Sequence, residues 1–227
     1  MTRTIRLATL LASAAAAVLF ANVASAGAAA ETIGETGTVA GTCGPDEAYV
    51  QRTLASGPRY SPRAPGVITS WSAAGDQDPN QTIVLMVLRR DGATKFTSVG
   101  NDVVRTLAPN VLNTFTGLHL PIGPNQRLAV YLPSESNASC VFETANPGDT
   151  FGSSVPYFVG LPPPPPIGLP PVGVPFDYGA RNPGFRINAQ AVVERTGKRD
   201  AAITKCKKKH SARARRKCRK KAKLLPV

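Results

Sequence analysis

Residues that perform acid–base catalysis are scarce in this sequence of 227 residues. It contains two histidines, and only His119 lies outside the last 30 residues. A lone histidine between leucines on an expected strand is usually a packed or surface residue. The Gly-x-Ser-x-Gly elbow, the His-Glu-x-x-His zinc motif and the glycine-rich phosphate loops are all missing. The sequence therefore argues against an enzyme, and it predicts no cofactor.

Carboxylates are present, but their spacing matches no established catalytic site. Glu47, Glu143 and Asp149 are scattered along the chain. They would act as a glycosidase pair only if the fold brought two of them together.

One acidic segment resembles the opening of a calcium loop. Asp76, Asp78 and Asn80 place three oxygen ligands at alternate positions. Gln81 then stands where the sharp-turn glycine belongs, and Val87 stands where the closing glutamate belongs. We therefore expect a solvated turn without a metal, and a less regular calcium loop is the alternative.

Aromatic residues form only 6% of the chain. The single tryptophan, Trp71, lies in the segment Ile68-Thr69-Ser70-Trp71 of a predicted strand, and one such tryptophan is more often a core residue. Exposed rings stack on sugars in many carbohydrate-binding sandwiches, so an aromatic binding face is the alternative. The tyrosines that would join Trp71 on such a face are Tyr49, Tyr60, Tyr131, Tyr157 and Tyr178.

Long apolar runs are missing except at the N-terminus. Arg3 and Arg6 precede an apolar run at residues 7–20, and Ala24-Ser25-Ala26 supplies the small residues that a signal peptidase must fit. This run has about 14 residues, whereas a transmembrane helix needs about 20. We interpret residues 1–26 as a cleavable secretory signal peptide. The mature protein is expected outside the cytoplasm, without a transmembrane span.

The chain has four cysteines, and an even number in an exported protein predicts disulfides. Cys43 and Cys140 lie in the body of the chain, whereas Cys206 and Cys218 lie near its end. Pairing within each region is the simplest of three connectivities, and free buried thiols are the alternative. A Cys43–Cys140 bridge would close a loop of about 100 residues, which the chain-entropy model values at up to about 4.7 kcal/mol.

Short apolar runs separated by turn residues predict an all-β fold. Residues 83–88 are apolar at every position, as expected of a central strand covered on both faces. Residues 187–193 alternate largely between apolar and polar side chains, as expected of a half-exposed strand. No helical segments separate the runs, which favours an antiparallel β-sandwich over residues 41–197. The predicted strands are residues 48–53, 67–72, 82–89, 95–99, 103–107, 114–120, 127–132, 140–143 and 186–194.

Two further segments are distinguished by composition. Residues 27–40 are small and polar, and we expect a flexible linker there. Residues 161–175 are proline-rich and should form an extended polyproline II loop that joins two strands. A ligand for an aromatic groove on a partner is the alternative role of this loop.

Several stretches of the body resemble known sequences. They are GVITSWS (66–72), IVLMVLR (83–89), LAPNVLNTF (107–115) and LPIGPNQRLAVY (120–131). In these stretches the chain resembles a group of uncharacterised secreted proteins of high-GC bacteria. The resemblance implies a jelly-roll-like β-sandwich over residues 43–195 and implies no known activity. Members commonly carry a Gly-Asp turn where this chain has Asn125-Gln126, so any role of that acid is absent here.

The net charge of +13 comes entirely from the C-terminal basic tail, residues 198–227. Residues 1–197 hold 13 Lys/Arg and 13 Asp/Glu, which cancel. The tail holds 14 Lys/Arg and the single acid Asp200. Any anionic partner is therefore expected to bind the tail. The residues expected to contact it are Lys205, Lys207, Lys208, Lys209, Arg213, Arg215, Arg216, Lys217, Arg219, Lys220 and Lys221.

The basic tail is expected to be helical or disordered. On one continuous helix its few apolar residues would form a single narrow stripe. Charge repulsion should keep such a helix largely unfolded until an anionic surface neutralises it. The stripe would consist of Ile203, Cys206, His210, Ala214, Cys218, Ala222 and Leu225.

The two tail cysteines restrict this picture. In a straight helix their α-carbons would lie about 18 Å apart, beyond the disulfide reach of about 7 Å. A bridge between Cys206 and Cys218 therefore needs a bend, which we expect near His210-Ser211. Free thiols and a bridge between two chains are the alternatives. His210 and the two cysteines would lack a fourth ligand, so we expect no zinc site.

The sequence thus predicts a secreted, non-enzymatic β-sandwich that associates with the cell envelope through its basic tail. The expected partners are anionic cell-envelope polymers or lipid headgroups, bound in a salt-sensitive manner. A carbohydrate-binding module that binds a glycan is the alternative function. Extracellular DNA is the alternative partner of the tail.

Overall fold

The computed structural model describes residues 30–41, 43–154, 169, 171–179, 182–195 and 198–222. The predicted signal peptide and most of the proline-rich loop lie outside these residues. The strands and helices are β1 Glu31–Glu35, β2 Glu47–Thr53, β3 Gly66–Ala74, β4 Gln81–Arg90, β5 Lys95–Asn101, β6 Arg105–Leu107, β7 Leu112–Ile122, β8 Gln126–Leu132, β9 Val141–Glu143, β10 Thr150–Ser153, β11 Pro175–Asp177, β12 Asn182–Pro183, β13 Phe185–Ile187, β14 Ala189–Glu194, α1 Lys198–Lys207 and α2 Ala212–Ala222.

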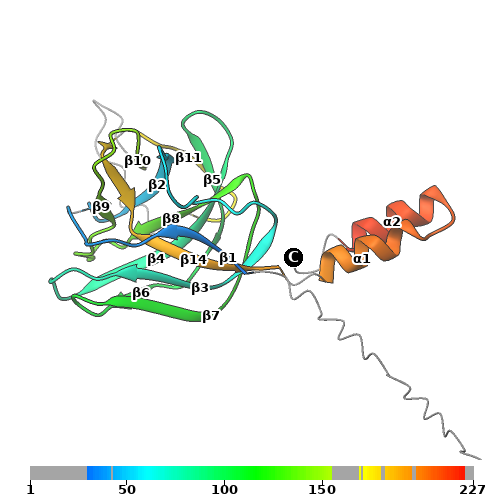
Figure 1. The fold of residues 1–227 in the computed structure, drawn as a ribbon, viewed down its shortest axis with the longest axis horizontal. Helices are drawn as coiled ribbons and strands as arrows, with labels where there is room; N and C mark the ends of the chain where they lie inside the picture. The colour runs from blue at the N-terminus through cyan, green and yellow to red at the C-terminus, as the bar shows by residue number, and fades with distance from the viewer. Residues whose placement is uncertain are drawn as a thin grey trace, which may run out of the picture.

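Eight strands pair like one long antiparallel hairpin that has been rolled up. β1 pairs with β14, β2 with β8, β3 with β7, and β4 with β5. The rolling places these strands in two sheets, with the orders β1-β14-β3-β7 and β5-β4-β8-β2. In Figure 1 β3 and β7 run along the lower edge of the sandwich, and β2 and β10 lie at its upper end. This is a jelly roll, and the predicted all-β sandwich is confirmed.

The apolar strand at residues 83–88 is the centre of the fold, as predicted. β4 lies between β5 and β8, and its residues from Ile83 to Leu88 are fully buried. Ile83, Leu85 and Val87 belong to the core cluster that also holds Trp71 and residues of β14. Val84, Met86 and Leu88 belong to a second cluster on the opposite face of β4. Both faces of this strand are therefore covered, which explains its continuous apolar sequence.

The predicted flexible linker at residues 27–40 is wrong at residues 31–35. Residues 31–35 form β1, which pairs along its whole length with β14. Ile33 of this strand is 1% exposed and belongs to the main core. The small, polar composition concealed the strand because its pairing partner lies more than 150 residues away in the sequence.

Two other predicted strands differ in detail. The strand predicted at 186–194 is interrupted at Asn188, where the chain leaves its pairing with β9 and begins its pairing with β1 and β3. The Asn188 side chain is buried and donates to the carbonyl of Ala74 over 3.0 Å, so the interruption is itself hydrogen-bonded. The strand predicted at 103–107 begins only at Arg105, because Val103 and Val104 are exposed.

The predicted bridge between Cys43 and Cys140 is present. The two α-carbons lie 5.8 Å apart, and both residues belong to the main core. The bridge joins the segment before β2 to the segment before β9, across 97 residues of sequence. It therefore constrains the unfolded chain strongly.

Candidate functional site

The basic tail folds as two short helices joined by a turn at residues 208–211. α1 ends at Lys207, and α2 begins at Ala212. Ser211 caps α2, since its hydroxyl accepts a hydrogen bond from the Ala214 N–H over 3.1 Å. The tail is therefore not one continuous helix with a single stripe, and the bend that a Cys206–Cys218 bridge was expected to need near His210-Ser211 is present. We call this unit, residues 198–222, the basic hairpin.

A disulfide closes the basic hairpin. Cys206 of α1 and Cys218 of α2 are bonded, with their α-carbons 5.5 Å apart, as predicted for a bent tail. The bond consumes both thiols, so they are not available to join His210 in a zinc site. Small residues beside the bridge leave an apolar groove of about 430 Å³ between the helices. Its lining is Ala202, Cys206, Ala214, Lys217, Cys218, Lys221 and Ala222.

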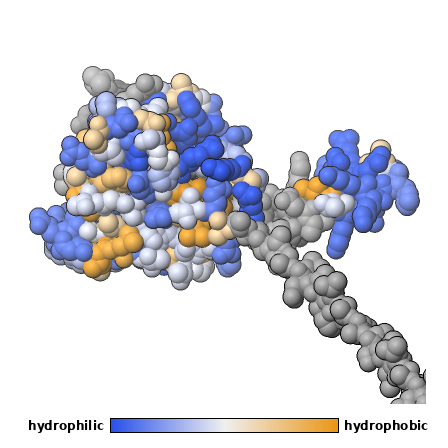
Figure 2. Space-filling view, in the orientation of Figure 1, coloured by the Kyte–Doolittle hydropathy of each residue, from blue (hydrophilic) through white to orange (hydrophobic). Residues whose placement is uncertain are grey.

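The eleven cations predicted to bind an anionic surface are all exposed. They occupy 17 consecutive residues, from Lys205 to Lys221, without any acidic residue between them. None of them forms an ion pair with a residue that the structure describes. Figure 2 shows the hairpin as hydrophilic over most of the face in view. The hairpin therefore presents a high, uncompensated positive charge to solvent.

Within α2 the cations repel one another along the helix. Arg213, Lys217 and Lys221 follow one another at intervals of four residues, and so do Arg215 and Arg219. Like charges at this spacing destabilise a helix, because their side chains are neighbours on its surface. The disulfide joins α2 covalently to α1.

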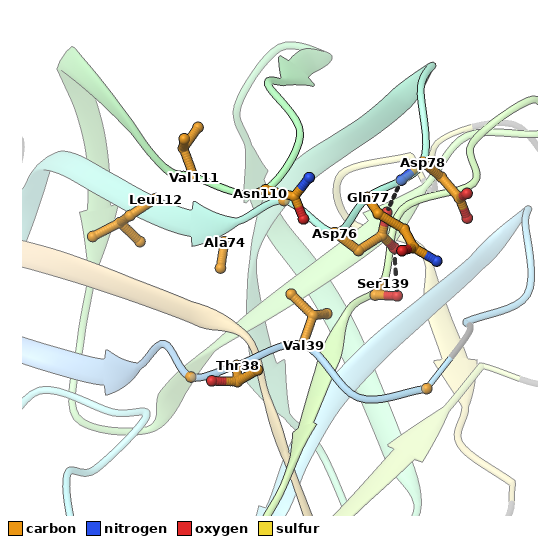
Figure 3. A pocket seen from close by; sticks show the side chains of 13 residues that line it. Thr38, Val39, Ala74, Asp76, Gln77, Asp78, Asn110, Val111, Leu112 and Ser139 are labelled. Carbon is orange, nitrogen blue, oxygen red and sulfur yellow. Dashed lines mark hydrogen bonds between the residues drawn. The ribbon is translucent and has the colours of Figure 1, made fainter.

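A cleft of about 680 Å³ lies beside the acidic turn between β3 and β4 (Figure 3). Asp76 and Asp78 line one part of it, and Val111 and Leu112 line another. Figure 3 shows no aromatic side chain among those that line it.

The Asp76 carboxylate organises this turn. Its Oδ1 accepts from the Asp78 N–H over 2.8 Å, and its Oδ2 accepts from the Ser139 hydroxyl over 2.6 Å. The Gln81 amide bonds both the N–H and the carbonyl of Asp76. The segment is thus the turn that the sequence predicts. Among the described residues, no group of three His, Cys, Asp or Glu is placed to hold a metal ion.

The aromatic residues do not form a sugar-binding face in the described structure. Trp71 is 1% exposed, packs against Phe115 and donates its indole N–H to Asp102 over 2.8 Å. The core position predicted for Trp71 is confirmed. The alternative of a stacking platform is wrong for the tyrosines that the structure describes, because Tyr49, Tyr60, Tyr131 and Tyr178 are all buried. Tyr157 lies outside the described residues.

Asp149 serves the fold rather than a catalytic pair. Its side chain is completely buried and accepts from Arg186 Nε over 2.9 Å. Burial alone would raise the pKa of Asp149. Hydrogen bonds from the Ala55 N–H, Arg186 and Thr144 outweigh burial and lower its pKa below the usual value. His119 is exposed on β7 and forms no hydrogen bond with a described residue.

The fold and the site define a jelly-roll β-sandwich followed by a disulfide-closed, cationic helical hairpin. Two disulfides of this kind are typical of proteins that fold in an oxidising compartment. Within the part of the chain that the structure describes, no helix is both long and apolar enough to cross a bilayer. Comparison of the chain with protein-family models, curated proteins and solved structures found no match. The resemblance to secreted jelly-roll proteins of high-GC bacteria stays a prediction.

Proposed function

We propose that this chain is a secreted, non-enzymatic jelly-roll protein that the basic hairpin holds against the cell envelope. The ligands of the hairpin are the anionic groups of envelope polymers or lipid headgroups. The signal-peptide pattern of residues 1–26 supports export, and the two disulfides support an oxidising destination.

One observation carries this proposal: eleven exposed cations, without acidic partners among the residues that the structure describes, stand on one covalently closed unit. A polyanion that contacts several of them releases counterions, so affinity falls steeply as salt rises. The disulfide keeps the cations close together before binding, which reduces the ordering that binding requires. The sandwich contributes little to this attraction, since residues 27–197 hold 11 Lys/Arg and 13 Asp/Glu.

The test compares retention of three full-length proteins on isolated cell envelopes. The first is the unaltered chain, and the second carries Lys207→Gln, Lys208→Gln and Lys209→Gln in and beside the turn of the hairpin. The third is the matched control with Arg63→Gln, Arg89→Gln and Lys95→Gln in the sandwich, which removes the same charge elsewhere. We expect only the hairpin variant to be released at lower salt, with a salt slope smaller by about one for each anionic group that it no longer neutralises.

Two further experiments identify which envelope component supplies the anionic groups. Vesicles with and without anionic lipid test the headgroups, and nuclease treatment of the envelope tests extracellular DNA. Release by nuclease would replace the envelope with DNA as the partner. Equal retention of all three proteins, independent of salt, would contradict the proposal.

A further inference from the structure

A second cluster of cations lies in the sandwich, in a pocket built from three separated segments. The end of β2, the loop at residues 59–61 and the start of β8 enclose about 280 Å³. Three arginines line this pocket, Arg52, Arg59 and Arg127, and no acidic residue of the described part of the chain does. The remaining lining residues are Gln51, Leu54, Tyr60 and Ser61. In Figure 2 strongly hydrophilic surface gathers between the β4–β5 hairpin and the loop that leads into β3.

Arg127 is the fixed member of the cluster. Its Nη1 donates to the carbonyls of Gln51 over 2.9 Å and Arg52 over 2.7 Å, which sets the plane of the guanidinium. These two partners are neutral, and no ion pair joins Arg127 to a described residue. Burial lowers the pKa of Arg127, and the positive charges of Arg90 and Arg52 lower it further. The charges that act on this half-buried cation are therefore repulsive.

The other two arginines are held at the same pocket in different ways. Arg52 donates to the carbonyls of Ala93 over 2.9 Å and Gly179 over 3.4 Å. The backbone of Arg59 is fixed because its carbonyl accepts from the Gly34 N–H over 2.7 Å. Its side chain is exposed and makes no ion pair with a described residue, so it is free to close over a ligand.

The polar groups beside the arginines are already satisfied by the fold. The Gln51 amide bonds the carbonyls of Thr53 and Thr150 and the N–H of Ile187. The Tyr60 hydroxyl donates to the carbonyl of Ile187. Gln51 and Tyr60 therefore line the pocket as neutral residues and do not neutralise the arginines. Arg186 shows the contrast, because this buried arginine has carboxylate partners in Asp149 and Glu35.

We propose that the pocket of Arg52, Arg59 and Arg127 binds one anionic group of a small ligand, a phosphate, sulfate or carboxylate. Guanidinium groups present forked donors that match the oxygens of these anions. The residues of the sandwich carry more acids than bases, so three arginines that share one pocket without an acid are not a consequence of composition. The small volume suits a single anionic group, whereas the basic hairpin offers an extended surface to a polymer.

The experiment follows the arginine Nε–Hε signals of the full mature chain by NMR. The probes are inorganic phosphate, sulfate and acetate, each added at an ionic strength held constant with chloride. We expect the Arg127 and Arg59 signals to shift and saturate with at least one probe. Arg59→Gln should weaken binding about tenfold, the loss of one charge-assisted hydrogen bond. The matched control is Arg63→Gln, which removes a neighbouring exposed charge that does not line the pocket.

A fourth protein tests whether the pocket binds anions independently of the basic hairpin. Lys207→Gln, Lys208→Gln and Lys209→Gln together should leave the affinity at Arg127 unchanged, whatever they do to envelope retention. Preference for phosphate and sulfate assigns a tetrahedral anion, and preference for acetate assigns a carboxylate. The proposal is overturned if the Arg127 shift fails to saturate with any probe, if Arg63→Gln weakens binding as much as Arg59→Gln, or if the hairpin substitutions abolish the shift.

Discussion

Arg186 donates a hydrogen bond from Nε to Asp149 Oδ2 over 2.9 Å, and both side chains are buried in the sandwich. The same guanidinium also bonds Glu35 of β1 and the carbonyl of Ser56. Asp149 in turn accepts from the Ala55 N–H over 2.9 Å. This pair therefore fastens β1, β13 and two loops at one point. It explains why β1, which has little apolar surface, is held in place.

Asp149→Asn should lower the free energy of unfolding by about 3 kcal/mol. The substitution removes the buried negative charge and leaves the Arg186 charge with only the partly exposed Glu35 as a counter-ion. Urea denaturation measures the change, as a lower midpoint with an unchanged m value. The control is Asp91→Asn, which breaks the exposed Arg89–Asp91 pair and should leave stability close to that of the unaltered chain. An equal decrease in the free energy of unfolding in both variants would show that burial does not determine how much an ion pair stabilises the fold.

Acid should destabilise the sandwich through Asp149 and Asp102. Burial would raise the pKa of Asp102, but hydrogen bonds from Arg105, Trp71 and the Val103 N–H lower it below the usual value. Unfolded aspartates titrate near about 3.9, so the unfolded chain takes up protons before the folded one. The stabilisation is thus complete above that pH and is lost as the pH falls through the lower folded-state pKa values. Denaturation at a series of pH values measures this loss, and Asp149→Asn should show a smaller acid dependence.

Much of the fold was predictable because local patterns and long-range pairing agree. Turn residues and period-two patterning located the strands, and the continuous apolar run 83–88 identified β4 as central. β1 was not predictable in this way, since Ile33 is the only large apolar residue of a short polar segment and its pairing with β14 is remote in sequence. The physical cause of this strand is tertiary packing and the Glu35–Arg186 contact, neither of which leaves a local signal.

The two proposed anion-binding sites differ in the same way, in how far the sequence reveals them. The basic hairpin is contiguous in sequence, so its charge was evident, and disulfide geometry required a bend if Cys206 and Cys218 pair within the chain. The arginine pocket draws Arg52, Arg59 and Arg127 from three segments, and only the rolled topology brings them together. Among the described residues no acid lines that pocket, and this is a property of the fold that composition does not reveal.

Gly34→Ala should destabilise the sandwich more than Gly117→Ala. Both glycines have positive φ, +74° and +78°, so both substitutions add backbone strain of about 1 kcal/mol or more. A Cβ at Gly34 would also lie 2.1 Å from the carbonyl oxygen of Ala189, whereas a Cβ at Gly117 would meet nothing within 4 Å. Thermal and urea unfolding measure the stability of both variants, and the difference between them reports the cost of the contact with Ala189. Equal destabilisation would show that β1 and β14 separate at little cost.

Loss of the Cys206–Cys218 bridge should unfold the basic hairpin and leave the sandwich intact. α1 and α2 have 10 and 11 residues, shorter than the about 12–15 residues that isolated helices need in water. Repulsion among their cations opposes them further, and the chain-entropy model gives a bridge of this span about 3 kcal/mol. In a protein with Cys206→Ser and Cys218→Ser, NMR shifts of residues 202–222 should therefore move to random-coil values, with unchanged shifts in β1–β14.

Ser211→Ala provides the matched control for this last variant. It removes the cap of α2, worth about 1 kcal/mol, while the disulfide stays. The hairpin should then keep helical shifts with some fraying at Ala212. The protein with Cys206→Ser and Cys218→Ser retains every cation, so its binding to the envelope should stay salt-sensitive. This binding should become weaker, because an unfolded tail must be ordered when it binds. Helical shifts that persist without the bridge would show that the sequence of the tail, and not its covalent closure, sets its shape.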